Sequence, residues 1–80
     1  MTEEEIQLIE DRCRKATAGP WIAFVEGREQ FCGSSIIRTA GEDIDFCGAT
    51  AEDIDFIANA RQDIPKLIEE VRRLHSMLDE

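Results

Sequence analysis

The pentapeptide Glu42-Asp43-Ile44-Asp45-Phe46 recurs as Glu52-Asp53-Ile54-Asp55-Phe56, and the residues around the two copies predict different secondary structures. The first copy lies between two glycine-containing turns, and its acidic and apolar residues alternate, as in a half-buried strand. The second copy follows Thr50, whose hydroxyl can cap a helix while Asp53 reaches back to the Thr50 backbone. We therefore expect a strand from the first copy and the start of a helix from the second.

The segment before the first copy predicts one helix and two strands. Thr2 and Glu5 have the spacing of a capping box, which predicts a helix from about residue 3 to residue 16 or 17. Gly19 is expected to supply a left-handed turn after this helix, and Pro20 to prevent its continuation. Extended segments are expected at residues 21–25, 30–32 and 34–39, with a break at Gly33. Together with the first pentapeptide they predict a meander of about three short antiparallel strands.

The segment after Thr50 predicts two helices that cover this sheet. Proline inside a helix costs about 3 kcal/mol, so we expect Asp63-Ile64-Pro65 to be a junction between two helices. The last helix carries apolar residues at heptad spacing, namely Ile64, Leu67, Ile68, Val71, Leu74 and Leu78. This stripe either covers the sheet, which we favour, or packs against a second copy of the chain. The expected fold is thus a single α+β domain over residues 1–80.

Composition restricts the function classes. The net charge of −9 disfavours direct binding to nucleic acid, which requires a basic face. No apolar run is long enough to cross a membrane, and the acidic N-terminus differs from a signal peptide, so we expect a cytoplasmic protein.

The cysteines Cys13, Cys32 and Cys47 are odd in number and widely spaced, which favours reduced thiols. Neither they nor the acidic residues have the spacing of a zinc or calcium site, so no metal or cofactor is expected.

Two segments resemble a group of small, mostly uncharacterised phage and prophage proteins. They are Ala16-Thr17-Ala18-Gly19-Pro20-Trp21 and residues 55–68, with the sequence Asp-Phe-Ile-Ala-Asn-Ala-Arg-Gln-Asp-Ile-Pro-Lys-Leu-Ile. The group carries an Ala-Thr-Pro-Gly-Pro-Trp turn and a Phe-Ile-Ala-x-Ala-Arg-x-Asp-(Ile/Val)-Pro helix pair, and Ala18 departs from its proline. The resemblance implies phage origin and this order of elements, but it implies no catalytic or binding residues.

No reaction class can be assembled from these residues, so we expect a protein without enzymatic activity. Our first hypothesis is a homo-oligomeric anti-defence protein that sequesters a small anionic nucleotide signal. Its expected ligand-binding residues are Arg61, Trp21, Thr17, Gly19 and Arg38. Core burial of Trp21 and an ion pair from Arg61 to Asp63 or Glu52 are the structural alternatives.

A second hypothesis assigns function to the acidic residues. In it, the protein binds and blocks a basic surface of a host defence or nucleic-acid-binding protein. The residues that would form the contact are Glu42, Asp43, Asp45, Glu52, Asp53 and Asp55. A small structural or assembly component is a third hypothesis. The sequence alone leaves open whether the two acidic pentapeptides share one surface.

Overall fold

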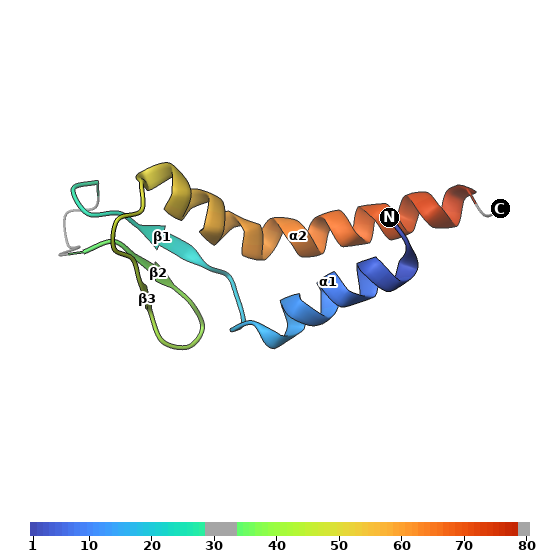
Figure 1. Ribbon diagram of the computed structural model, residues 1–80, viewed down its shortest axis with the longest axis horizontal. Coiled ribbons are helices and arrows are strands. Elements are labelled where there is room, and N and C mark those ends of the chain that lie inside the picture. The colour runs from blue at the N-terminus through green and yellow to red at the C-terminus, as the bar shows by residue number, and fades with distance from the viewer. Residues whose placement is uncertain (29–33, 79–80) are drawn as a thin grey trace.

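The structure is a computed structural model that describes residues 1–28 and 34–78 (Figure 1). The chain forms helix α1 (Glu3–Lys15), strands β1 (Ile22–Phe24), β2 (Ile36–Arg38) and β3 (Ile44–Asp45), and helix α2 (Ala51–Leu78). Within the described residues the strands form one antiparallel sheet in the order β1-β2-β3. Ala23 lies opposite Ile37, which in turn lies opposite Ile44. The predicted α+β class, N-terminal helix and meander are confirmed, while the segment 30–33 lies outside the described residues.

Both helices begin where their capping residues predict. The Glu5 amide donates to the Thr2 hydroxyl, and the Thr2 amide donates to the Glu5 carboxylate. At the start of α2 the Asp53 amide donates to the Thr50 hydroxyl, and the Thr50 amide donates to the Asp53 carboxylate, both at 3.1 Å. The two pentapeptides therefore differ as expected, because the first contains β3 and the second lies in the opening turns of α2.

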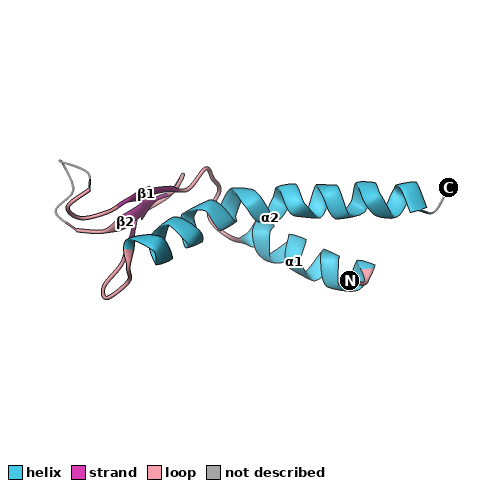
Figure 2. Ribbon diagram, turned by 90° about the horizontal axis from the view of Figure 1, so that it is seen from above, coloured by secondary structure: helices cyan, strands magenta, loops and turns pink. Residues whose placement is uncertain are grey.

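The predicted junction at Pro65 is wrong, because α2 is one continuous helix through this residue. Proline removes only the backbone hydrogen bond that residue 65 would donate to residue 61, and a helix can relieve the remaining clash by bending. Figures 1 and 2 show such a bend, with the N-terminal part of α2 inclined to the remainder. The cost of one proline is thus insufficient to divide 28 residues that otherwise favour a helix.

The predicted left-handed turn at Gly19 is also wrong. Positive φ angles occur at Gly27 and Gly48 among the described residues, and helix α1 ends with Ala16 in an extended conformation. The Gly19–Pro20 peptide bond is cis. A Cβ atom at Gly19 would lie 3.3 Å from the Gln62 side chain and 3.4 Å from that of Arg61. The close approach of α2, and not a left-handed conformation, therefore explains the absence of a side chain at this position.

The core lies between the sheet and the first turns of α2. Val25, directly after β1, and Ile37 of β2 pack with Ile54 and Ala58 from α2. The heptad stripe from Ile64 to Leu78 was expected to cover the sheet, and this prediction is wrong, because the sheet is too short to reach it. Figure 2 shows the sheet at one end of α2 and α1 beside its middle.

Helix α1 is joined to α2 by a charged and an apolar contact. Arg72 on α2 donates to Glu10 at 2.6 Å and to Glu3 at 3.1 Å, both on α1. Ile6 of α1 and Ile68 of α2 are buried. The molecule is consequently elongated, with extents of 53 × 20 × 19 Å.

Candidate ligand-binding site

A groove between α1 and α2 is the candidate site whose lining best suits an anionic ligand. It has a volume of about 330 Å³ and is open along one side. Helix α1 supplies Ile9, Arg12, Cys13 and Ala16, the following turn supplies Trp21, and α2 supplies Phe56, Ile57, Ala60, Arg61 and Ile64. We call this cavity the arginine groove. Its lining contains two arginines and no carboxylate, although the chain has 18 acidic and 9 basic residues.

The turn that carries Trp21 is fixed to α2 by Gln62. The Gln62 carbonyl oxygen accepts a hydrogen bond from the Trp21 amide at 2.8 Å, and its Nε2 donates to the Trp21 carbonyl at 3.3 Å. The Trp21 indole donates to the carbonyl of Thr17 at 2.9 Å. The indole is therefore held beside the groove in one orientation, partly buried against the core cluster.

Arg61 bonds the chain through one nitrogen of its guanidinium group and leaves the other two nitrogens without a partner among the described residues. Its Nε donates to the Thr17 carbonyl at 3.0 Å, which ties α2 to the end of α1. Among the described residues its two terminal nitrogens have no hydrogen-bond partner, and the alternative ion pair with Asp63 or Glu52 is not formed. Arg61 can consequently offer the four N–H groups of these two nitrogens to a ligand.

Arg12 is the second cation of the arginine groove. It is exposed, and within the described part of the chain its side chain makes no hydrogen bond or ion pair. The sequence did not predict Arg12 as a site residue, because nothing in the sequence shows that this side chain faces α2. Its position three residues after Ile9 places it on the same helical face, which is the signal that would have found it.

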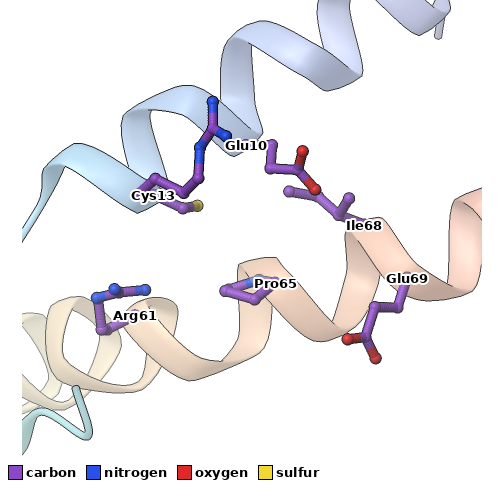
Figure 3. A pocket seen from close by; sticks show the side chains of 7 residues that line it. Glu10, Cys13, Arg61, Pro65, Ile68 and Glu69 are labelled. Atoms are coloured by element: carbon purple, nitrogen blue, oxygen red, sulfur yellow. The ribbon is translucent and has the colours of Figure 1, made fainter. Parts of the chain in front are cut away.

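A second cavity, of about 260 Å³, lies on the other side of Arg61 (Figure 3). Pro65 and Ile68 of α2 line it together with Cys13 of α1. Arg14 also lines it, but so do the carboxylates of Glu10 and Glu69, which would repel an anion. The arginine groove is therefore the better site for an anionic ligand.

The structure brings some of the predicted ligand-binding residues together and separates others. Trp21 and Arg61 share the arginine groove, and Thr17 contributes its carbonyl to both of them. Gly19 is packed against Gln62 and Arg61 next to the groove. Arg38 lies elsewhere, on the sheet, where it stacks 5.0 Å from the centre of the Phe24 ring and lies 3.7 Å from Asp43.

Half of the predicted acidic contact residues are engaged within the chain. Asp55 accepts two hydrogen bonds from Arg28, Asp53 caps α2, and Asp43 pairs with Arg38. The hydrogen bonds from Arg28 lower the pKa of the Asp55 carboxyl below its ordinary value. Exposed carboxylates without a described side-chain partner remain at Glu42, Asp45 and Glu52.

Comparisons of the chain with protein-family models, with curated proteins and with solved structures found no match. Within residues 1–28 and 34–78, no helix has an apolar stretch long enough to cross a bilayer, even though α2 is 28 residues long. The same residues contain no group of three histidine, cysteine or acidic side chains placed to hold a metal ion.

Proposed function

We propose that this protein binds a small anionic ligand that carries a planar ring, such as a nucleotide, in the arginine groove. The observation that carries the proposal is the composition of the groove, which joins Arg12, Arg61 and the Trp21 indole without a carboxylate. The arginines would bind phosphate oxygens and the apolar lining would contact the base. A volume of about 330 Å³ lies within the usual range of small-molecule pockets.

The proposed role is sequestration. The lining of the arginine groove includes the Cys13 thiol, but it includes no histidine or carboxylate that could act as a general base beside a bound ligand. With the resemblance to small phage proteins, this supports capture of a nucleotide signal of host antiviral defence by a non-enzymatic cytoplasmic protein.

Calorimetric titration with cyclic mononucleotides, cyclic dinucleotides and ADP-ribose tests the proposal. We expect binding of at least one of these ligands, accompanied by a change in the fluorescence of Trp21, the single tryptophan. Arg12→Ala should weaken binding about 10- to 100-fold, as expected for the loss of a hydrogen bond to a charged group. Because Arg12 makes no described side-chain contact, the circular dichroism spectrum should not change.

Lys15→Ala is the matched control, since it removes one positive charge from the same helix without touching the arginine groove. It should bind as the unmodified chain does. Absence of heat with every nucleotide would overturn the proposal, and so would equal weakening by Arg12→Ala and Lys15→Ala.

The acidic alternative, a contact with a basic host protein, rests on fewer groups than the sequence suggests. Glu42, Asp45 and Glu52 could contribute to it, while Asp43, Asp53 and Asp55 already hold partners of their own. Its test is a double variant, Asp45→Lys with Glu52→Lys, which should lose a basic partner protein in a salt-sensitive manner.

A further inference from the structure

Helix α2 carries an apolar stripe that its own chain leaves largely uncovered. The stripe consists of Ile57, Ala60, Ile64, Leu67, Val71, Leu74 and Leu78, and we call it the α2 seam. Its residues are separated by alternating steps of three and four, which is the heptad spacing of a coiled coil. Leu67 and Leu78 are 62% and 82% exposed.

The contacts of α2 within the chain use a neighbouring stripe. Ile54 and Ala58 pack against the sheet, and Ile68 and Arg72 lie toward α1. Three residues of the α2 seam, Ile64, Leu67 and Val71, line an open apolar cavity of about 580 Å³ together with Ile68 of α2. Met1 and the α1 residues Ile6, Ile9 and Arg12 form its other wall. The middle of the α2 seam thus borders an open apolar trough.

The chain exposes more surface than a compact monomer of its mass, and the excess is at least as large as one side of a standard interface. A compact monomer of 9.1 kDa should expose about 4,900 Å², whereas this chain exposes 5969 Å². The excess of about 1,100 Å² exceeds the roughly 800 Å² that one partner contributes to a standard interface. The radius of gyration, 15.7 Å, likewise exceeds the value of about 12 Å expected for 80 residues.

We propose that the α2 seam binds the α2 seam of a second copy, so that the protein is a dimer built on a parallel two-stranded coiled coil. The residue types at the a and d positions indicate how many helices the coiled coil contains. In heptad notation three of the four a positions hold the β-branched residues Ile57, Ile64 and Val71 and the fourth holds Leu78, while Ala60, Leu67 and Leu74 occupy the d positions. β-Branched residues at a with leucine at d favour two parallel strands.

The residues that flank the α2 seam favour the parallel orientation. In a parallel pair, each g position meets the e position five residues further along the partner. Glu70 then meets the partner's His75, and Phe56 meets the partner's Arg61, which is a cation–aromatic contact. In an antiparallel pair, Glu70 would lie opposite either the partner's Asp63 or the partner's Glu70. These carboxylates carry like charges and would repel each other.

Ala60 lies where the α2 seam meets the arginine groove. This residue is the one small side chain of the α2 seam, and it lines the arginine groove. In the parallel pair the partner's Phe56 would lie beside Arg61 at the open side of this groove. The spacing, the exposed surface and the flanking charges carry the inference without any ligand. Because Ile57, Ala60 and Ile64 belong to both surfaces, the pair would cover part of the α2 wall of the arginine groove.

Sedimentation velocity and light scattering on the full chain without nucleotide test the proposal. We expect a mass of about twice 9.1 kDa for the unmodified protein at micromolar concentration. Leu67→Glu should weaken dimerisation at least 100-fold, because it buries a charge in the α2 seam. Leu8→Glu is the matched control, since Leu8 is 57% exposed on α1 and lines neither the trough nor the arginine groove.

Two further variants complete the test. Leu74→Glu should repeat the effect of Leu67→Glu, and circular dichroism should show that both variants remain folded. Leu74→Cys, in a chain whose other cysteines are replaced by serine, should form a disulfide-linked dimer on oxidation, because each d position faces its own copy in the parallel pair, whereas an antiparallel pair allows this only at the two-fold axis. A monomeric unmodified protein, a dimer that survives Leu67→Glu, or failure of Leu74→Cys to cross-link would overturn the proposal.

Discussion

Gln62 is the side chain that joins the turn after α1 to helix α2. It bonds both backbone groups of Trp21 and also donates to the Ala58 carbonyl of its own helix at 3.1 Å. A single amide thereby satisfies two polar groups of a turn that lacks regular secondary structure. The position of the indole beside the arginine groove depends on this residue.

Gln62→Ala should lower the free energy of unfolding by about 1–3 kcal/mol, because the partly buried Trp21 amide loses its acceptor. Urea denaturation followed by Trp21 fluorescence measures the change. Asn59→Ala is the control, because the Asn59 side chain is exposed and bonds only the Asp55 carbonyl of its own helix. Equal losses in the two variants would contradict the assigned role of Gln62.

The ion pair between Arg28 and Asp55 should make the stability of the protein depend on pH. Hydrogen bonds from Arg28 lower the pKa of Asp55 below its ordinary value of 3.8. A carboxyl whose pKa is depressed in the folded state contributes stability that is fully present above the unfolded pKa and is lost as pH falls through the folded pKa. The contribution of this pair should therefore disappear below pH 3.8.

Asp55→Asn should accordingly have a lower melting temperature than the unmodified protein near neutral pH, and the difference should shrink on acidification below pH 3.8. Thermal melts across this pH range measure it. Asp45→Asn removes a carboxylate without a described side-chain partner and should show no such convergence. A difference for Asp55→Asn that does not change with pH would exclude the ion pair as its cause.

At the scale of elements, the start of each helix is determined by local hydrogen bonds and the path of each helix by its neighbours. The capping boxes at Thr2 and Thr50 involve residues three apart, so the sequence predicts them directly. Continuation of α2 through Pro65 depends instead on whether the helix can bend while it contacts both the sheet and α1. Propensity therefore predicts the beginning of α2 better than its length.

Thr50→Ala should destabilise the protein by about 1 kcal/mol, because the Asp53 amide loses the hydroxyl that accepts its hydrogen bond. Thr50→Ser retains the oxygen and should have nearly the stability of the unmodified chain. Guanidinium denaturation compares the three proteins. If the serine variant is as unstable as the alanine variant, the hydroxyl is not the source of the stability.

At the scale of the whole molecule, Arg72 joins the N-terminal helix to the C-terminal helix in the half of the molecule that lies away from the sheet (Figure 1). Its guanidinium reaches Glu3 and Glu10, which lie more than 60 residues earlier in the sequence. Few other polar contacts join α1 to α2 within the described residues, so this one controls how far the helices separate. The width of the arginine groove depends on that separation.

Arg72→Ala should let α1 move away from α2, which hydrogen exchange would report as faster exchange of the α1 amides. Arg73→Ala is the matched control, because Arg73 pairs with Glu70 on the same helix and does not reach α1. It should leave α1 exchange unchanged. Faster exchange in both variants would show that loss of charge, and not loss of the contact to α1, is responsible.

The sequence predicted the order of the elements, both capping boxes and the different structures of the two pentapeptides. Trp21 and Arg61, which the sequence predicted to bind a ligand together, lie in one groove, although their role there stays a prediction. The sequence misplaced Arg38 and missed Arg12. Whether either arginine faces Trp21 depends on how α1, the sheet and α2 are arranged in space.

The sequence by itself therefore determined the local features of this protein, because capping and strand alternation involve residues only a few positions apart. The tertiary structure alone decided that Arg12 and Arg61 lie in one groove free of carboxylates, since these residues belong to different helices. It also decided that the sheet covers only the first turns of α2. The α2 seam consequently remains exposed, and its apolar surface is the part of the molecule that most requires a partner.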